Sequence, residues 1–396
     1  MNLQRPLPRN KALKSLRSGN ATLGQWSYIL VCLLIFLRTA CSEVDITIVE
    51  NAIARGAVCS DGSPPAYHFD KGVGEGANNW LVHLEGGGWC ESIARCSFRA
   101  EGDVGSSKHM TKLNFTGILN SKKEFNPDFY NWNRIVVRYC DGSSFTGDVE
   151  EVDPAMKLYF RGARIFRAVM EELLAQGMQN ASNALLSGCS AGGLATILHC
   201  DNFRDLLPNS SRVKCVSDAG YFIHAKDYAG GNSSQDFFQE VVQLHCFYPQ
   251  YVVPQLKTPL FIVNSAYDTW QIENILAPKR ADPSDSWKSC KFNIRKCCPS
   301  QARIWQDFRS ELLSAVTGLG EGSSRGTFIN SCHTHCQTKL DAKWHGDAAS
   351  KLMNKTISEA VGDWYYDRSG FQQIDREHEW PQLCVLDPME HPPDYP

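Results

Sequence analysis

One stretch of sequence decides the predicted fold: Leu185-Leu186-Ser187-Gly188-Cys189-Ser190-Ala191-Gly192-Gly193. It joins an apolar strand to a Gly-x-Ser-x-Gly pattern, and we expect a helix to begin near Leu194. A serine on such a sharp strand-to-helix turn exposes its hydroxyl at the edge of a sheet, and the flanking glycines avoid clashes with the neighbouring strand and helix. The pattern alone is a weak signal in a chain with 30 glycines, so its meaning depends on the surrounding sequence.

The rest of the chain alternates between two kinds of segment. Short apolar runs predict further strands at residues 45–49, 79–84, 133–139, 213–217, 259–264 and 327–330. Helical spacing of apolar residues predicts helices at residues 154–176, 194–207, 237–244, 303–317 and 348–361, the first of them capped by Asp153. Polar motifs follow the strand ends. This arrangement predicts an α/β fold with a doubly wound, mostly parallel sheet flanked by helices and a ligand site at its carboxyl edge.

The N-terminal residues have the composition of a targeting segment. Five Lys and Arg and no acid lie in the first 20 residues, and an apolar run follows from Tyr28 to Leu37. The run is shorter than the roughly 20 apolar residues of a membrane span, so we predict a signal peptide over residues 1–41, with an uncleaved signal anchor as the alternative. We expect the main folded domain over residues 42–370 and a polar tail over residues 371–396.

Charge and cysteine content limit the partners and the compartment. Residues 1–41 hold six of the 40 Lys and Arg and none of the 43 Asp and Glu, so the remaining chain is acidic. Nucleic acid is therefore not an expected partner, and a polyanionic substrate would need a local basic patch. The 16 cysteines favour an oxidising compartment, although their connectivity does not follow from sequence. Five sequons are candidates for glycosylation: Asn114, Asn180, Asn209, Asn232 and Asn354.

The strand-end motifs supply the parts of a serine hydrolase. A serine hydroxyl needs an imidazole and a carboxylate to act as a nucleophile at neutral pH. The chain offers Ser190, then Asp268 and His335 after later strands, in the order expected of an α/β-hydrolase. Backbone N–H groups of the glycine-rich loop at residues 86–88 and of Ala191 are candidate oxyanion donors. This chemistry needs no metal and no cofactor.

Several alternatives stay open at this point. Asp218 is the rival acid. The residues alone leave His333 and His335 nearly even as the base, and His345 is a weaker third choice. Cys189 is a rival nucleophile.

Two further motifs have two interpretations each. Cys332-His333-x-His335-Cys336 has the residues of a metal cluster, but secretion favours disulfides over zinc thiolates. Trp89, Tyr139 and Trp270 are candidates for stacking on a sugar ring, and the alternative is that they belong to the core.

Five motifs together resemble the plant pectin acetylesterase family, over roughly residues 45–370. They are Leu84-Glu85-Gly86-Gly87-Gly88-Trp89-Cys90, Tyr139-Cys140-Asp141-Gly142-Ser143, Gly188-Cys189-Ser190-Ala191-Gly192-Gly193, Ser265-Ala266-Tyr267-Asp268-Thr269-Trp270-Gln271-Ile272 and Asn330-Ser331-Cys332-x-x-His335-Cys336-Gln337. The animal carboxylesterase Notum is a relative of this family. The resemblance implies a secreted serine esterase with the α/β-hydrolase fold.

Carried over by motif, the resemblance also implies residue roles. The nucleophile would be Ser190, the acid Asp268 and the base His335, because the family's base is the histidine followed here by Cys336-Gln337. The implied oxyanion donors are the N–H groups of Gly87, Gly88 and Ala191, and the implied bridges are Cys59–Cys140 and Cys90–Cys96.

The expected reaction is hydrolysis of O-acetyl esters on cell-wall pectin (galacturonan), through an acetyl-enzyme, by a protein secreted to the cell wall. The alternatives are a Notum-like deacylase of another ester and a catalytically silent wall-binding protein. Two features depart from the family. His333 stands where a residue that does not ionise is usual, and the tail after Asp375 retains only Cys384 of a cysteine-rich ending, which leaves one bridge in doubt.

Overall fold

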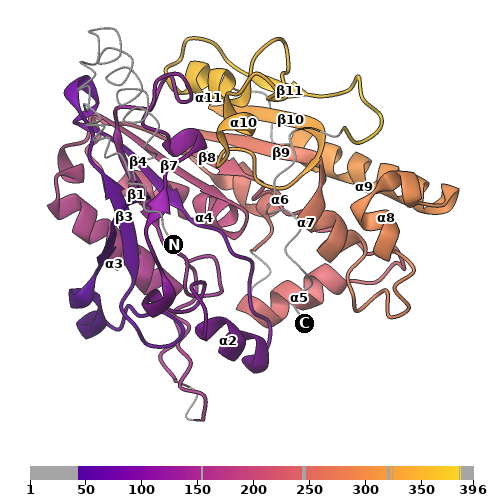
Figure 1. The fold of residues 1–396 in the computed structure, drawn as a ribbon, viewed down its shortest axis with the longest axis horizontal. Coiled ribbons are helices and arrows are strands. Elements are labelled where there is room, and N and C mark those ends of the chain that lie inside the picture. The colour runs from indigo at the N-terminus through magenta and orange to yellow at the C-terminus, as the bar shows by residue number, and fades with distance from the viewer. Residues whose placement is uncertain are drawn as a thin grey trace, which may run out of the picture. The chain divides into compact units, whose positions relative to one another are not determined.

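A nine-stranded sheet forms the centre of the computed structural model (Figure 1). The structure describes residues 43–152, 155–242, 247–318, 322, 324–382 and 384, which belong to a compact unit that starts at Glu43. The predicted signal peptide or anchor lies outside the described residues. Within the described ranges, no helix combines the length and the apolar character needed to cross a membrane.

The strands and helices have the following bounds. The strands are β1 (Glu43–Val44), β2 (Ile46–Ile48), β3 (Ala66–Asp70), β4 (Asn79–Leu84), β5 (Leu113–Asn114), β6 (Asn133–Val137), β7 (Asn183–Cys189), β8 (Arg212–Asp218), β9 (Leu260–Asp268), β10 (Arg325–Thr334) and β11 (Gln372–Ile374). The helices are α2 (Ile93–Ala100), α3 (Gly162–Ala175), α4 (Ala191–Asp205), α5 (Ser233–Val242), α6 (Pro249–Val252), α7 (Thr269–Gln271), α8 (Lys288–Phe292), α9 (Pro299–Thr317), α10 (Asp341–Trp344) and α11 (Ile357–Tyr365).

The large sheet has the order β11-β10-β9-β8-β7-β4-β6-β3-β2. All neighbours from β11 to β6 are parallel, whereas β3 pairs antiparallel with β6 and with β2. The carboxyl ends of β4, β7, β9 and β10 therefore lie at one edge. This confirms the predicted α/β fold and brings the strand-end motifs of the sequence to the same edge.

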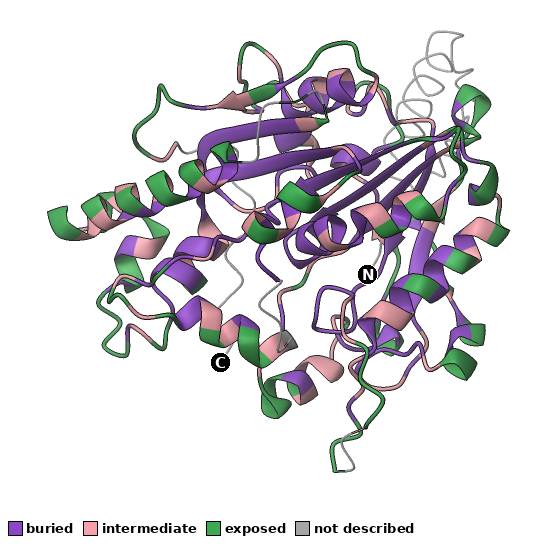
Figure 2. Ribbon diagram, turned by 180° about the vertical axis from the view of Figure 1, so that it is seen from behind, coloured by how far each residue is buried: buried purple, intermediate pink, exposed green. Residues whose placement is uncertain are grey.

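Strand β7 shows why these apolar runs are buried on both sides. Leu185 belongs to the core cluster that includes Trp364 of α11, and Leu186 belongs to the one that includes Leu194 of α4. Successive side chains of a strand point to opposite faces, so a parallel strand covered on both faces must be apolar at every position. Figure 2 shows the central strands buried between the covering helices.

Two predicted helices start later than the sequence pattern suggested. Helix α3 begins at Gly162 and not near residue 154, because Lys157 has a left-handed φ of 54° and Tyr159 N–H donates to the Ser60 carbonyl at 3.0 Å, outside any helix. Helix α11 begins at Ile357 and not at residue 348, because Thr356 and Glu359 form a capping box there. Residues 153 and 154, the predicted cap, lie outside the described residues.

The structure also contains elements that the sequence pattern did not reveal. Helix α2 lies in the stretch between the predicted strands at residues 79–84 and 133–139, where no helix was predicted, and the antiparallel strand β3 was not predicted either. Part of the predicted C-terminal tail joins the sheet, since Gln372–Ile374 form β11 and Gln382 N–H donates to the Ser331 carbonyl at 2.7 Å. Disulfide Cys332–Cys384 ties the same segment to β10.

Candidate active site

Ser190 occupies the sharp turn between β7 and α4. Its backbone has φ 60° and ψ −127°, a conformation that side chains rarely adopt, and its N–H donates to the Asp218 carbonyl at 2.9 Å. The end of β4 packs directly against this turn. A Cβ atom on Gly86 would lie 2.4 Å from the carbonyl oxygen of Cys189, so only glycine allows this approach. The tight turn presents Ser190 at the carboxyl edge of the sheet.

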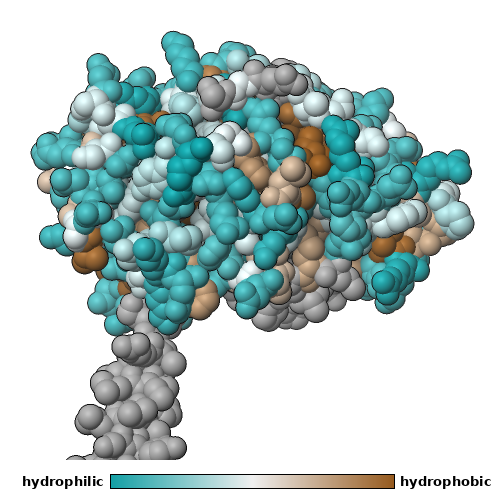
Figure 3. Space-filling model, turned by 90° about the horizontal axis from the view of Figure 1, so that it is seen from above, coloured by the Kyte–Doolittle hydropathy of each residue, from teal (hydrophilic) through white to brown (hydrophobic). Residues whose placement is uncertain are grey.

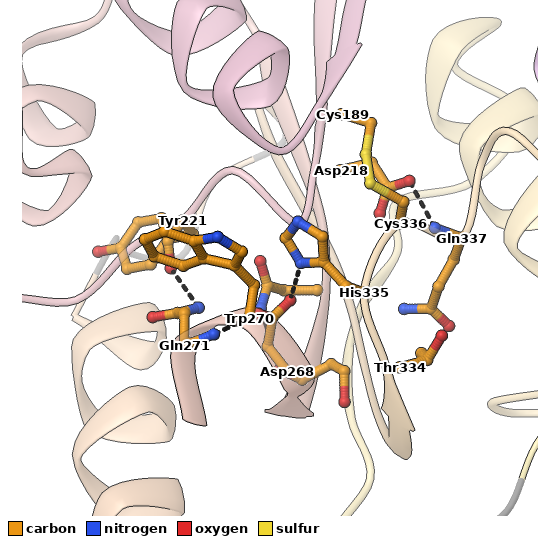
Figure 4. A network of polar contacts seen from close by, with 12 residues as sticks. Cys189, Asp218, Tyr221, Asp268, Trp270, Gln271, Thr334, His335, Cys336 and Gln337 are labelled. Carbon is orange, nitrogen blue, oxygen red and sulfur yellow. Dashed lines mark hydrogen bonds and ion pairs between the residues drawn. A yellow bond between two sulfur atoms is a disulfide. The ribbon is translucent and has the colours of Figure 1, made fainter. Parts of the chain in front are cut away.

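His335 and Asp268 form a hydrogen-bonded pair at the same edge, in which the imidazole is half-buried and the carboxylate buried (Figure 4). Asp268 ends β9 and is fully buried, and its Oδ2 lies 2.8 Å from Nδ1 of His335, which follows β10. The other carboxylate oxygen accepts the N–H of Gln271 at 2.9 Å and caps α7. The carboxylate thus favours the tautomer with a proton on Nδ1, in which Nε2 is the basic nitrogen.

A disulfide connects the two halves of this site. Cys189 precedes Ser190, Cys336 follows His335, and the two cysteines are bridged with their Cα atoms 5.7 Å apart. Figure 4 shows the bridge beside the imidazole. Ser190 and His335 are therefore each one residue from the same covalent link. This bridge also occupies the thiol of Cys189, the rival nucleophile.

Asp218, the rival acid, holds the loop that follows the imidazole. Its Oδ2 accepts hydrogen bonds from Gln337 N–H at 2.6 Å, Thr338 N–H at 2.7 Å and the Thr338 hydroxyl at 2.8 Å. Burial raises the pKa of this carboxyl. Because this oxygen accepts three hydrogen bonds, Asp218 holds the loop at Gln337 and Thr338 in position. The carboxylate that contacts His335 Nδ1 is that of Asp268.

The other candidate histidines lie elsewhere. His333 sits on β10 with its ring 5.5 Å from the Trp305 ring, and it lines a cavity beside α8 and α9. His345 Nδ1 lies 3.0 Å from the Thr356 hydroxyl. Of the three, His335 is the one whose ring nitrogen is placed on the buried Asp268 carboxylate.

A family model described as Pectinacetylesterase matches residues 37–245 and 244–385 of the chain. The chain belongs to the pectinacetylesterase family. It is 53% identical over 369 residues to "Pectin acetylesterase 7" of Arabidopsis thaliana, which covers 88% of this chain and 94% of that protein, and 52% identical to "Pectin acetylesterase 11" with the same coverage. The resemblance inferred from the motifs is thereby confirmed, and the protein is a carboxylic ester hydrolase of this family.

More distant similarity reaches the animal Notum proteins. "Palmitoleoyl-protein carboxylesterase notum1a" of Danio rerio is 29% identical over 280 residues, 62% of this chain and 55% of that protein. The solved structure of the Wnt deacylase Notum from Drosophila superimposes with a TM-score of 0.72 at 24% identity, covering 87% of this chain and 99% of that one. The structural likeness confirms the predicted α/β-hydrolase fold.

The candidate oxyanion donors of this family member surround the serine turn. Gly87 and Gly88 follow β4 with φ values of 157° and 68°, and Ala191 is the first residue of α4. The N-terminus of a helix attracts negative charge, so Ala191 N–H is well placed for an oxyanion. The Tyr139 hydroxyl donates to the Gly88 carbonyl at 2.8 Å and fixes the course of the loop.

The structure corrects the expected role of two aromatic residues. Trp89 is 4% exposed and Tyr139 is fully buried, so neither ring is available to stack on a sugar. Trp89 Nε1 donates to the Ser144 hydroxyl at 2.8 Å, and the Tyr139 hydroxyl accepts Ser144 N–H at 3.0 Å. Both side chains instead brace the glycine-rich loop. Trp270 is half-buried and remains a candidate for substrate contact.

A cluster of packed aromatic rings, called the aromatic wall below, lies next to the imidazole. The sequence patterns did not predict this cluster. The Phe222 ring lies 6.4 Å from the His335 ring and 5.0 Å from each of the rings of Trp89 and Trp270. Phe238 adds a further ring 5.1 Å from Trp89. Edge-to-face packing at these distances fills the space with side chains.

Glu273 is an acid near the site that no motif pointed to. It lies in the π-helical turn Ile272–Leu276 directly after α7. Burial raises its pKa to about 7, with Lys291 and His335 opposing the shift and Asp268 adding to it. A carboxyl of this kind changes charge in the neutral pH range close to the His335–Asp268 pair.

The cysteines are used as disulfides in the described residues. Both pairs that the resemblance implied, Cys59–Cys140 and Cys90–Cys96, are bridged. Further bridges are Cys189–Cys336, Cys200–Cys215, Cys290–Cys297 and Cys332–Cys384. The tail cysteine in doubt is thus paired, and among the cysteines that the structure describes, Cys298 is exposed and forms no bridge. Because Cys332 and Cys336 are bridged, the alternative of a metal cluster with thiolate ligands does not hold.

All five sequon asparagines are exposed.

Proposed function

We propose that this protein is a secreted serine esterase that removes O-acetyl groups from cell-wall pectin, with Ser190 as nucleophile, His335 as base and Asp268 as acid. The observation that carries the proposal is the His335–Asp268 pair at 2.8 Å, joined to the Ser190 turn by the Cys189–Cys336 bridge. The names of the Arabidopsis relatives support acetylated pectin as substrate.

The reaction runs in two balanced steps. In the first, Ser190 Oγ attacks the acetyl carbonyl carbon and His335 Nε2 takes the hydroxyl proton, and the proton then passes to the sugar oxygen as the C–O bond breaks. The acetyl group remains on Ser190. In the second, His335 takes a proton from a water molecule that attacks the acetyl-enzyme, and acetate leaves as the proton returns to Ser190 Oγ.

Two features lower the energy of the charged intermediates. The buried Asp268 carboxylate stabilises the imidazolium that forms on His335. The N–H groups of Gly87, Gly88 and Ala191 would bind the oxyanion, and a donor of this kind typically contributes roughly 3 kcal/mol of transition-state stabilisation.

The aromatic wall supports a short acyl group. Phe222 lies beside the imidazole and is backed by Trp89 and, behind it, Phe238, where a long acyl chain would need an open apolar pocket. Beyond its carbonyl, an acetyl group has a single methyl group, which needs little room. This observation favours deacetylation over Notum-like removal of a fatty acyl group.

The bridges and sequons support an extracellular location. Multiple disulfides and exposed Asn-x-Ser/Thr sites fit an extracellular protein. Together with the targeting composition of residues 1–41 and the family's substrate, they support secretion to the cell wall.

The test compares acetate release from acetylated pectin by the wild-type protein and by Ser190→Ala. We expect Ser190→Ala to lose activity by several orders of magnitude and to resist labelling by a fluorophosphonate probe. Ser210→Ala is a matched control, because this exposed serine precedes β8 at the opposite edge of the sheet. Equal acetate release by Ser190→Ala and wild type would disprove the mechanism.

A further inference from the structure

A cavity next to the candidate active site has the composition of a carbohydrate subsite. It has a volume of about 630 Å³ and is lined by Arg295, Asn293, His333, Trp380 and Gln382, among others, with no acidic side chain. Cavities that bind small ligands typically measure about 300–1,000 Å³ and combine apolar walls with a few polar groups. Trp380 is 51% exposed, so its ring face is available.

The cavity adjoins the proposed catalytic centre. His333 lines its wall, and His335 is two residues further along the same chain, which spans at most about 7 Å. Figure 1 places α8 and α9, which flank the cavity, next to α7 at the carboxyl edge. The backbone at one wall of the cavity is therefore within about 7 Å of the backbone of the proposed base.

The segment that contributes Arg295 to the cavity is rich in positive charge. Residues 286–306 contain five basic residues and no acid, in a chain with a net charge of −3: Lys288, Lys291, Arg295, Lys296 and Arg303. In the part of the chain that the structure describes, none of the five forms an ion pair, and four are exposed, with Lys291 half-buried. Figure 3, in which left and right are those of Figure 1, shows hydrophilic surface around small apolar patches at the end that holds α8 and α9.

Both walls are held in place covalently. The bridge Cys290–Cys297 closes the turn that carries Arg295, and Cys332–Cys384 fastens the segment of Trp380 to β10. His333 N–H also donates to the Gln382 carbonyl at 3.0 Å. A site whose groups are ordered before binding loses less conformational entropy when the ligand arrives.

We infer that this cavity and the basic segment at residues 286–306 bind galacturonate residues of the pectin chain that flank the acetylated sugar. The inference rests on the proposed function, because it takes the substrate to be acetylated galacturonan. Each sugar without an ester on its carboxyl carries one negative charge, which the unpaired bases complement. Trp380 supplies a ring for the apolar face of a sugar.

The experiment measures binding of an oligogalacturonate that carries no ester groups, by calorimetry, to the wild-type protein and to three variants. We expect Arg295→Ala to raise the dissociation constant about three- to fivefold and Trp380→Ala about fivefold. Arg167→Ala is the matched control, because Arg167 is an exposed arginine on α3, on the far side of the molecule from α8 in Figure 1, and it should leave binding unchanged. Binding of wild type should weaken at high salt, and a neutral oligogalactan of equal length should bind more weakly.

The outcomes separate this inference from the proposed function. If wild type releases acetate from pectin but does not bind the oligogalacturonate, or if Arg295→Ala and Arg167→Ala weaken binding equally, the inferred subsite is wrong and the esterase is not. If wild type binds the oligogalacturonate but releases no acetate, the proposed function fails and the subsite stands. With both correct, Arg295→Ala loses activity on acetylated pectin about three- to fivefold relative to its activity on p-nitrophenyl acetate.

Discussion

Removing the bridge between Cys189 and Cys336 should lower kcat even under conditions in which the protein stays folded, so the loss of stability alone would not explain the effect. The test removes the bridge with the double substitution Cys189→Ser and Cys336→Ser, which leaves the side chains close to their original size. The bridged cysteines are 147 residues apart, and for a loop of this length the chain-entropy relation gives about 5 kcal/mol of lost stability. We therefore expect the melting temperature to fall by roughly 10 °C.

The effect on turnover comes from geometry. Ser190 and His335 are each adjacent in sequence to the bridge, so its removal frees the serine turn and the imidazole loop to shift relative to each other. A displacement of about 1 Å between catalytic groups can cost up to 10²-fold in rate. We expect kcat on p-nitrophenyl acetate to fall about 10- to 100-fold at a temperature where circular dichroism shows the variant to be folded.

A second bridge supplies the control. Cys200 of α4 and Cys215 of β8 are buried and 15 residues apart, so the corresponding double serine variant should lose about 3 kcal/mol. Neither cysteine adjoins a proposed catalytic residue, and kcat should stay within about twofold of wild type under the same conditions. If the two double variants lost the same fraction of kcat while folded, the bridge would act through stability alone and the reasoning would be refuted.

Three further outcomes follow from the site. Asp268→Asn keeps an oxygen to cap α7 but should lower kcat about 10³- to 10⁴-fold with little change in melting temperature, and a loss below tenfold would contradict its role as the acid. Phe222→Ala opens the wall beside His335 and should raise the activity on octanoate relative to acetate p-nitrophenyl esters at least fivefold, so an unchanged ratio would show that the wall does not limit acyl length. Glu273 has its pKa raised by burial from 4.5 to about 7, so the folded state holds a proton that the unfolded state releases in this range. Stability of wild type relative to Glu273→Gln should therefore fall as pH rises from about 4.5 to 7, and a constant difference in melting temperature over this range would contradict the buried acid.

The sequence predicted the sheet well, and it named the catalytic candidates, because both depend on local signals. Each central strand is apolar at successive positions, as at Leu185 and Leu186, since it is covered on both faces. Polar motifs after these strands then gather at one edge by topology alone. Residue chemistry narrowed the candidates for the base to His333 and His335. The contact between His335 and Asp268 depends on the path of the chain at the end of β10, and no local sequence pattern encodes that path.

The errors arose where distant residues decide local structure. Helical spacing extended α3 back toward residue 154, but the left-handed φ of Lys157 and the hydrogen bond from Tyr159 N–H to the Ser60 carbonyl exclude a helix there. The rings of Trp89 and Tyr139 stand beside catalytic motifs and looked like sugar contacts, yet both turn inward to meet Ser144. Disulfide connectivity joins residues up to 147 positions apart and is equally invisible to a local reading.

The order of the proposed triad along the chain has a consequence for biosynthesis. The serine turn is complete once β4, β7, α4 and β8 have formed, whereas the imidazole follows the last long strand, β10, and is linked to the turn through Cys336. Because a ribosome delivers the chain from its N-terminus, the nucleophile must wait for its base until β10 has joined the sheet. A partly made chain would therefore hold an inert serine, and hydrolysis of a small ester would report the moment when folding and oxidation of this edge are finished.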